Sequence, residues 1–557
     1  MMPRHTLPDN CTGGISLPCR TPEKGGQTMI GQLGQNLALC LVPMILVGTT
    51  WLLTKARGPF WLGDNFDPEY AYLCSSINLS YLQPIWHVDH PGTTMQLLGA
   101  LVFRVVYGVI GPPHSGLRAE VLANPEYYLR WVQGVAAGFN ILMVWFLGRL
   151  VFRKTRKLAP SLALQAAPFS SGLLLYQGFA RVSPEPLLLL MTLALIAVLI
   201  VFQFSETKTT TTLAGSRVIL LFALISGTAL ATKVTFAPLC LIPWLLLPGR
   251  RRKVAYLVGT FGFFGAFTFP IWGNYRRMLS WLFAVFAHSG IYGGGPVQIV
   301  DAASYFANLR SLLLSPSVFS VVLVVGVIVI VTSYAVPQVR SKSMAQRRFH
   351  LLQVVIAAQM ASALVVAKHW TGGRWHYMLP ATALSGTVLV FLWAYLRWLQ
   401  IELRLEFKGQ CWLAIGLALV WMSACTMDFL ATYRRLRESR DSLLAVGQFI
   451  EGHFPKYDRI YSYRSSSIPF ALEFGNHFSG GLQSSDLDRL YPNLYSYDIW
   501  QKSFFDHETP ISFRDLLNRS HGKIVFQGWP ELSVPGHPLT EVFHSQGESV
   551  YLLQAAP

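Results

Sequence analysis

Long apolar runs, separated by short polar connections, dominate the chain and limit what it can fold into. A run of about 20 apolar residues crosses the hydrocarbon core of a bilayer as a helix. Such runs lie near 33–54, 128–151, 159–178, 185–204, 216–234, 236–248, 254–272, 311–336, 350–367, 377–398 and 411–431. The run at 236–248 is short and could be half of a hairpin. The pattern predicts an all-α polytopic membrane protein with about 11–13 transmembrane helices.

Composition and charge support this class of protein. Hydrophobic residues make up 52% of the 557 residues and charged residues only 13%, which is far too apolar for a soluble enzyme. The excess of 45 basic over 28 acidic residues would suggest a nucleic-acid partner in a soluble protein. Here the basic residues cluster in short connections, so orientation in the bilayer explains them and no nucleic-acid partner is expected. The seven cysteines include no CxxC pair, which indicates neither a zinc site nor a disulfide framework.

The basic clusters predict which connections face the cytoplasm, where lysine and arginine are enriched. The clusters lie at 153–157, 250–253, 340–348 and around Arg397, Arg404 and Lys408. All fall on one face if the apolar stretch 93–111, which Arg104 interrupts, is a helix lying at the membrane interface. The chain then begins inside, and everything after residue 432 is extracytoplasmic. Three arginines after the last span resist this rule: Arg434, Arg435 and Arg437.

The chain is predicted to have three parts. Residues 1–32 begin with a polar, Gly- and Pro-containing stretch and form a disordered lead-in. Residues 33–432 form the transmembrane domain, with long external loops at 56–127 and 273–310. Residues 433–557 mix alternating segments such as "DRIYSYRSSSIPFALEF" and "GKIVFQGW" with helical ones, which predicts a small extracytoplasmic α/β domain.

Ionisable residues gather in the first external loop. "FDPEY" contains Asp67 and Glu69, and "HVDHPG" contains Asp89 and His90. Pro68 indicates a turn rather than a continued helix, so both carboxylates of the first motif can face an aqueous pocket at the bilayer edge. The alternative is a solvated loop that simply carries charge.

Further polar residues fall on the same predicted face. Arg181 and Glu185 lie in the outer turn "ARVSPEP", and His288 lies in "FAHSGIYGGG", where glycines allow a ligand to approach the backbone. Acids, histidines and cations together on one face indicate a site that handles a phosphate and a proton. His90 and His288 could also be ordinary loop histidines.

These motifs resemble those of the C-type (GT-C) integral-membrane glycosyltransferases, in particular the protein O-mannosyltransferase and lipid A aminoarabinose transferase group (glycosyltransferase family 39-like). Those enzymes carry an Asp in the first external loop, "HPP" or "KPP" preceded by an acid, a lysine closing a later span, and an "R-x-Y-x-x-P"-like motif. The matching positions are Asp67, "DHPG" at 89–92, Lys233 in "ATKVT", and "RWHYMLP" at 374–380. The sequence departs from the pattern at Pro68, which separates the two acids, and at Gly92, which replaces a proline. It also shows no clear acceptor-recognition module.

The resemblance implies an inverting glycosyltransferase that uses a polyprenyl-phosphate-linked sugar donor. A carboxylate at the membrane boundary can act as the base that takes the acceptor's proton. Asp67 is the expected base, with Glu69 beside it. The donor phosphate would be bound by four side chains: Lys233, Arg374, Arg181 and Tyr377. Lys233 could instead extend to the interface, as long cationic side chains do.

A divalent metal ion is a further possibility, because a carboxylate and a histidine near a phosphate can hold one. Asp89, with His90 or His288, would hold the ion or orient the donor. The expected location is the plasma (inner) membrane, with the site on the extracytoplasmic face and the lipid bilayer as its environment. The sugar stays open, and the acceptor could be a glycan, a lipid or a protein.

Two other classes of function stay open. A transporter or flippase of lipid-linked sugars would require charged residues near the middle of spans, whereas Glu185, Lys233 and Asp428 lie near the ends of the predicted spans. A glycan polymerase or ligase that uses a diphosphate-linked glycan would require a larger acceptor groove in the external loops.

Overall fold

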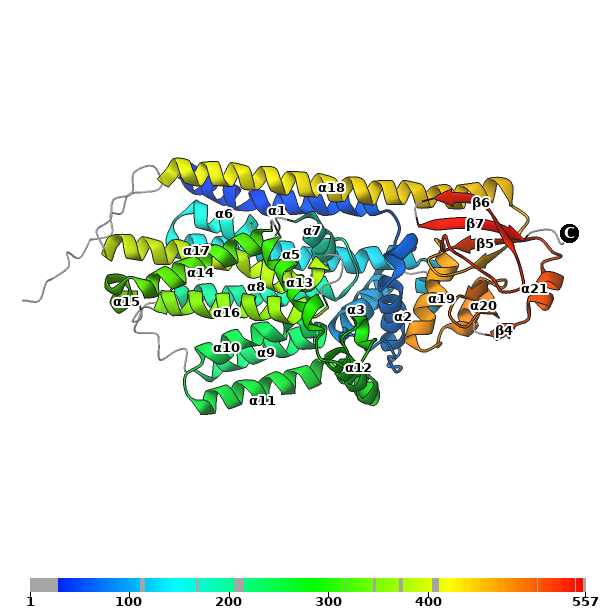
Figure 1. Cartoon of the computed structure of the whole chain (residues 1–557), viewed down its shortest axis with the longest axis horizontal. Coiled ribbons are helices and arrows are strands. Elements are labelled where there is room, and N and C mark those ends of the chain that lie inside the picture. The colour runs from blue at the N-terminus through cyan, green and yellow to red at the C-terminus, as the bar shows by residue number, and fades with distance from the viewer. Residues whose placement is uncertain are drawn as a thin grey trace, which may run out of the picture.

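A bundle of long helices and a smaller domain built on a β-sheet make up the computed structural model (Figure 1). The structure describes residues 29–110, 116–166, 169, 171–204, 215–315, 317–343, 347–369, 374–402, 410–507, 509–545 and 547–553. Residues 1–28, most of the predicted lead-in, lie outside these ranges. The predicted fold class, a helical membrane domain followed by a small α/β domain, is confirmed.

Seven helices of the described ranges are long and apolar enough to cross a membrane, and the chain is a multi-pass membrane protein. These are α1 (Met29–Arg57), α3 (Thr93–Ile110), α5 (Pro125–Thr155), α8 (Pro184–Gln203), α14 (Val318–Ala335), α16 (Arg347–Ala367) and α17 (Leu379–Glu402, preceded by the 3₁₀ turn η7, Trp375–Met378). Two further segments, α11 (Arg250–Phe267) and η5–α12 (Phe269–Asn274 and Tyr275–Ala287), are long and apolar enough only when taken together, and they meet at an angle of 83°. Counted as one broken span, they bring the number of spans to eight.

The other predicted runs form shorter or broken helices. The run at 159–178 is divided between α6 (Leu158–Ala166) and α7 (Gly172–Phe179). The runs at 216–234 and 236–248 become α9 (Ser216–Thr232), η4 (Val234–Cys240) and α10 (Leu241–Leu246). The external segments carry η1 (Gly63–Phe66), α2 (Glu69–Ser80), α4 (Leu117–Ala123), η6 (Ile291–Gly293) and α13 (Ala302–Leu314).

Helix α3 is the stretch, interrupted by Arg104, that is predicted to lie at the interface so that the basic clusters share one face. The Arg104 guanidinium donates a hydrogen bond to the carbonyl of Ser80, at the end of α2, so its charge is used within the protein. By length and hydropathy alone α3 could also span a bilayer. Figure 1 shows α2 and α3 at the end of the bundle that carries the sheet domain, whereas α15 (Pro337–Ser343) lies at the opposite end.

Helix α18 (Gln410–His453) explains the arginines that follow the last predicted span. It has 44 residues and continues from the bundle to the sheet domain (Figure 1), so Arg434 and Arg437 lie on one unbroken helix. Arg440, one turn further, donates to the carbonyl of Lys55 at the end of α1 (Nη1–O 2.7 Å). The predicted domain boundary at 432/433 therefore falls inside a helix.

The C-terminal domain contains a seven-stranded sheet in the order β4-β3-β2-β1-β5-β7-β6. Its strands are β1 (Asp458–Tyr461), β2 (Tyr495–Asp498), β3 (Ser503–Asp506), β4 (Thr509–Ile511), β5 (Ile524–Gly528), β6 (Leu539–Ser545) and β7 (Glu548–Leu553). The central strand β1 pairs in parallel with β2 and β5, and the outer pairings are antiparallel. Its helices are α19 (Ile468–Ser479), α20 (Ser484–Leu490) and α21 (Phe513–Arg519).

Helix α19 attaches this domain to the bundle. Ala471 and Leu472 of α19 share a buried apolar cluster with Phe66, Tyr70 and Ile77, which belong to η1 and α2. Gly475 of α19 packs so closely on α2 that a Cβ atom there would lie 2.4 Å from the carbonyl oxygen of Tyr70. The segment that carries the predicted base is thus held between the bundle and the sheet domain.

Candidate functional site

Five segments of the chain meet at the end of the bundle that faces the sheet domain (Figure 1). They are the η1–α2 junction with Asp67, the loop at 87–92, the turn between α7 and α8, and the junctions that follow α9 and precede α17. Most sequence-predicted residues lie in these segments, and the contacts below bring them together.

The Asp67–Glu69 segment forms a turn that leads into α2, as Pro68 predicted. The peptide between Asp67 and Pro68 is cis, and Pro68 precedes the first helical residue. Asp67 is exposed, which agrees with the expectation that it faces water. For Glu69 that expectation is wrong, because its side chain is 0% exposed. The two carboxylates therefore have different chemical roles available to them.

Glu69 forms a buried, two-point ion pair with Arg181. The guanidinium donates through Nε to Oε1 at 2.6 Å and through Nη2 to Oε2 at 2.5 Å. The same Nη2 donates to the backbone carbonyl of Asp67 at 2.6 Å. Burial alone would lower the pKa of Arg181, but the charge and hydrogen bonds of Glu69, together with the charges of Tyr176 and Glu185, outweigh burial and raise that pKa. Arg181 thus fixes the backbone of Asp67, a positioning role that differs from the phosphate binding expected for it.

A second buried ion pair joins Glu185, at the start of α8, to Lys233, directly after α9. Both residues are 3% exposed, so Lys233 does not extend to an open surface as the alternative interpretation required. Its Nζ also lies 4.8 Å from the centroid of the Tyr377 ring, where a cation is attracted by the negative ring face. The second predicted phosphate ligand is therefore already paired within the protein.

The Asp89–Gly92 loop docks onto the end of α9 beside Lys233. Pro91 pairs with Lys233 as an isolated antiparallel bridge, and the Gly92 N–H donates to the carbonyl of Thr232 at 3.3 Å. Gly92 has φ +72°, and a Cβ there would lie 2.2 Å from the Tyr72 hydroxyl. Proline holds φ near −65°, so it could not occupy this position. The backbone conformation at Gly92 therefore accounts for a glycine where the motif that this loop resembles has a proline.

His90 projects from this loop into an aromatic environment. Its ring meets that of Trp281 edge to face (centroids 4.9 Å apart) and lies 6.4 Å from that of Tyr377. Burial lowers the pKa of His90, and the nearby charge of Lys233 lowers it further, so the ring is neutral at pH 7. The buried Nδ1 has no hydrogen-bond partner in the described part of the chain. This imidazole nitrogen is thus a buried polar atom whose hydrogen-bonding capacity is unused in the described part of the chain.

Arg374 differs from Arg181 and Lys233, the other two cations predicted to bind the donor phosphate, in forming no ion pair within the described ranges. Its guanidinium carbon lies 5.0 Å from the centroid of the Tyr292 ring, and no carboxylate pairs with it within the ranges that the structure describes. Burial raises the pKa of Tyr292, as do Tyr377 and, more weakly, the charge of Asp67, while Arg374 lowers it. Tyr292 is thus within electrostatic reach of both Arg374 and the predicted base.

His288 occupies a different environment from the other predicted residues. It ends α12, its Nδ1–H donates to the carbonyl of Gly295 at 2.8 Å, and it pairs with Val297 across the glycine loop. Across the described ranges, no three or more His, Cys, Asp or Glu side chains are grouped as a metal site. A divalent ion held by Asp89 with His90 or His288 stays a prediction, and no step below depends on one.

Tyr72 is a central residue that the sequence analysis missed. It lies one helical turn after Glu69, so both side chains point from the same face of α2. Burial raises its pKa, and four carboxylates raise it further: Glu185, Asp89, Asp67 and Glu69. The spacing of Glu69 and Tyr72 was the signal in the sequence. Trp281 and His376 carried no comparable signal, because only the folded chain brings them to His90.

Comparisons with known proteins give a likeness in structure alone. No family model and no curated protein matches the chain. Among solved structures, the crystal structure of ArnT from Cupriavidus metallidurans bound to undecaprenyl phosphate has 13% sequence identity and a TM-score of 0.46, over 92% of this chain and 97% of that one. The apo structure of the same ArnT has 13% identity and a TM-score of 0.48, over 94% and 98%. These values carry no argument about a reaction, which has to come from the residues of the site.

Proposed function

We propose that the protein is an inverting glycosyltransferase that moves a sugar from a polyprenyl-phosphate donor to an acceptor on the extracytoplasmic face of the membrane. The observation that carries the proposal is the contrast between Asp67 and its neighbours. Asp67 is an exposed carboxylate whose backbone is clamped by Arg181, whereas Glu69 is buried and neutralised. A fixed, accessible carboxylate is what a general base requires.

The proposed reaction is a single displacement. Asp67 takes the proton of an acceptor hydroxyl while that oxygen attacks the anomeric carbon of the donor sugar. The bond from that carbon to the phosphate oxygen breaks, and polyprenyl phosphate leaves with the bonding electron pair. The new glycosidic bond forms on the opposite face of the sugar, so the anomeric configuration inverts. The leaving phosphate is stable as an anion and needs a cation rather than an acid.

Arg374 would supply that cation, since it lies near Tyr292 and has no carboxylate partner among the residues described above. Lys233 would act differently, because its charge is balanced by Glu185. It would hold the Asp89–Gly92 loop in place, and Tyr377 would close the space between Lys233 and His90. The neutral His90 could donate or accept one hydrogen bond at the phosphate.

The assignment of the site to the outer face rests on charge distribution. Lysine and arginine are enriched in cytoplasmic connections. The basic segment at 340–348 begins in α15, at the opposite end of the bundle from the sheet domain (Figure 1). A transporter is less well supported, because Glu185 opens α8 and Lys233 directly follows α9, so both lie at helix ends rather than mid-span.

Purified protein incubated with a set of polyprenyl-phosphate hexoses and pentoses tests the proposal. We expect release of polyprenyl phosphate from at least one donor, with transfer of its sugar to an added acceptor extract and inversion at the anomeric carbon. Heat-unfolded protein is the control. Release from none of the donors, or movement of an intact donor across a vesicle membrane without cleavage, would overturn the proposal.

A further inference from the structure

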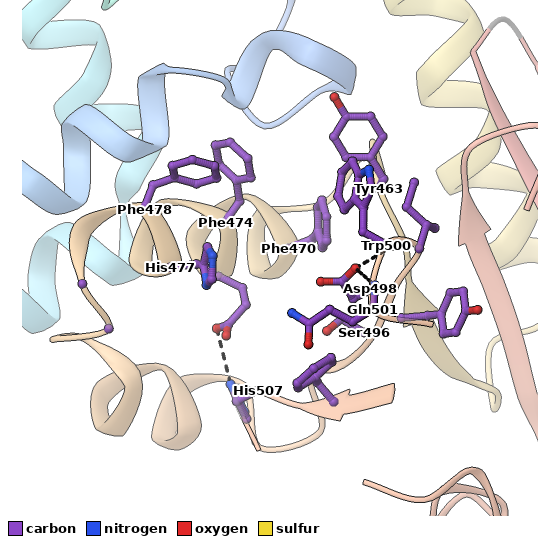
Figure 2. Close-up of a pocket in the computed structure, with 16 residues that line it drawn as sticks. Tyr463, Phe470, Phe474, His477, Phe478, Ser496, Asp498, Trp500, Gln501 and His507 are labelled. Carbon is purple, nitrogen blue, oxygen red and sulfur yellow. Dashed lines mark hydrogen bonds and ion pairs between the residues drawn. The ribbon is translucent and has the colours of Figure 1, made fainter. Parts of the chain in front are cut away.

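The sheet domain contains a pocket that the site described above does not use (Figure 2). Its volume is about 720 Å³, and it lies between α19 and the β2–β3 hairpin. Aromatic side chains from both sides line it, among them Phe470, Phe474, Tyr463 and Trp500. Polar side chains lie within the same wall, notably Glu473, Asp498, Gln501 and His507.

Trp500 is presented at this pocket by a rigid turn. The Asp498 carboxylate accepts hydrogen bonds from the backbone N–H groups of Trp500 (2.7 Å) and Gln501 (2.9 Å). The indole ring meets the Tyr463 ring edge to face with centroids 5.0 Å apart, yet 71% of Trp500 is exposed. Burying a tryptophan would stabilise the fold, so a large ring held in place but left open is typical of a binding surface.

Glu473 and His507 supply the polar side of the pocket. The carboxylate Oε2 lies 3.7 Å from His507 Nδ1 (dashed in Figure 2), and the Nε2–H of His507 donates to the Tyr491 carbonyl at 3.0 Å. Burial alone would lower the pKa of His507, but its interaction with the Glu473 carboxylate, together with the charges of Asp488 (3.3 Å from Nδ1) and Asp506, outweighs burial and raises that pKa. Glu473 is only 8% exposed, so the pocket offers a buried carboxylate beside apolar rings.

This combination matches a saccharide better than a lipid or a flat apolar ligand. The C–H faces of a pyranose ring pack on aromatic rings, and its hydroxyls donate to carboxylate and amide oxygens. Glu473 Oε2 accepts no hydrogen bond in the described part of the chain, and a lipid tail could donate none to it. The chemistry therefore favours a ligand with one apolar face and several hydroxyl groups.

The pocket is linked to the candidate site through α19. Phe470 and Phe474 each contact the ring of Phe66, with centroids 5.7 and 4.7 Å apart, and Phe66 directly precedes Asp67. Phe478, at the end of the same helix, lies 6.4 Å from the ring of His87, in the loop that leads to Asp89. The helix that lines the pocket thus contacts both segments that carry the predicted acids.

We propose that this pocket binds a saccharide unit of the acceptor, which would make the acceptor a glycan or a glycolipid. The inference rests on the proposed function in one respect, that the bound saccharide is the group that receives the sugar. The pocket as a saccharide site stands on its own residues and can be tested without any turnover.

Binding of soluble saccharides to the full-length protein in detergent is the first test. The probes are trisaccharides of glucose, mannose and N-acetylglucosamine, and a Ser/Thr-containing hexapeptide represents the alternative, peptide class of acceptor. Saturation-transfer NMR measures the binding of each probe. Trp500→Ala should weaken saccharide binding at least about tenfold, as loss of an aromatic anchor does. Trp500→Phe should retain part of the binding. Tyr457→Ala removes a ring of the same domain that is 36% exposed and lies outside the pocket, and it should change nothing.

The proposal is overturned if no saccharide binds, if Trp500→Ala binds as the wild type does, or if the peptide alone binds in a Trp500-dependent way. Kinetics then separate this proposal from the proposed function. Trp500→Ala should raise the KM for a saccharide acceptor while the KM for the donor is unchanged. Saccharide binding without any donor cleavage would support the saccharide-binding pocket but contradict the proposed glycosyltransferase function. Donor cleavage with an acceptor KM that does not change in Trp500→Ala would support the proposed glycosyltransferase function but contradict acceptor binding in this pocket.

Discussion

The candidate site at the end of the bundle and the pocket in the sheet domain differ in how their side chains are arranged. At the bundle end, two carboxylates are locked in buried ion pairs, Glu69 with Arg181 and Glu185 with Lys233. The sheet-domain pocket is lined mainly by aromatic rings, and one of them, Trp500, is 71% exposed. The ion pairs hold a few atoms in fixed positions, as bond-making chemistry requires, whereas the pocket offers a concave, mostly apolar surface on which a ligand can pack. The predictions below test this difference, from the largest expected effect to the smallest.

Asp67→Asn should give the largest effect if Asp67 is the base. The amide keeps the shape of the side chain but cannot take a proton, so kcat should fall by about 10²–10⁴, the range for loss of general-base catalysis. Donor KM should change little. Initial rates of polyprenyl phosphate release provide the measurement. Glu451→Gln is the matched control, because its carboxylate is exposed on α18 and forms an ion pair with Arg459 at 3.6 Å. A wild-type rate in Asp67→Asn would show that another group is the base.

Breaking the Glu185–Lys233 pair should destabilise the protein rather than weaken one ligand contact. Removing one partner leaves a buried charge uncompensated, at a cost of about 3–5 kcal/mol. Glu185→Gln and Lys233→Met should each lower the thermal unfolding midpoint strongly, and the double variant should cost less than their sum. The exposed Arg437–Asp441 pair (3.6 Å) is the control, and breaking it should cost under about 1 kcal/mol. Equal effects for the two pairs would contradict the contrast drawn above.

Much of the architecture could be predicted from the sequence because it depends on local patterns. Apolar runs gave the helices, alternation gave the α/β tail, and Pro68 gave the turn before α2. The partner of each charge could not be predicted. Glu69 meets a residue 112 positions away and Glu185 one 48 positions away, and no spacing rule links such residues. The sequence therefore indicated where ionisable groups gather but not which of them are neutralised.

The pocket was missed for the same physical reason. Its rings come from α19, from the β2–β3 hairpin and from the segment between β1 and α19, and in the sequence each appears as an ordinary core aromatic. Only the fold shows that Trp500 stays open while Phe504, four residues later, is buried in the domain core. Exposure, rather than residue type, distinguishes a binding ring from a packing ring.

Glu548 should make the stability of the sheet domain depend on pH. It is fully buried on β7, accepts hydrogen bonds from the Ser466 N–H (2.9 Å) and from Gln527 Nε2, and burial raises its pKa to about 7. A raised carboxyl pKa contributes stability that is complete below the ordinary value of 4.5 and is lost as pH rises through about 7. The loss should reach about 3 kcal/mol by pH 8.

Hydrogen exchange of β5 and β7 amides in the full-length protein, between pH 5 and pH 8 and corrected for intrinsic exchange, measures this loss. Glu548→Gln cannot ionise, so its protection should vary less with pH than that of the wild type. His507 contributes a change of the same sign in both proteins, because its raised pKa also favours the folded state at low pH. The difference between the two proteins therefore isolates Glu548, and parallel pH profiles would contradict the prediction.

Arg374→Gln should give the smallest effect and tests which cation meets the donor. Arg374 lies over Tyr292 without a carboxylate partner in the described ranges, so its removal breaks no buried ion pair and should leave the unfolding midpoint nearly unchanged. Loss of a charge-assisted hydrogen bond costs about 1.5–3 kcal/mol, which corresponds to an increase in donor KM of about 10- to 150-fold. Arg374→Lys keeps the charge without the two-pronged geometry and should recover part of the affinity.

Arg397→Gln, at an exposed arginine late in α17, is the control for Arg374→Gln. The opposite result would be an unchanged donor KM in Arg374→Gln and a raised donor KM in a Lys233 variant that still folds. The buried Lys233 would then bind the donor phosphate in place of Arg374, and its ion pair with Glu185 would not be purely structural.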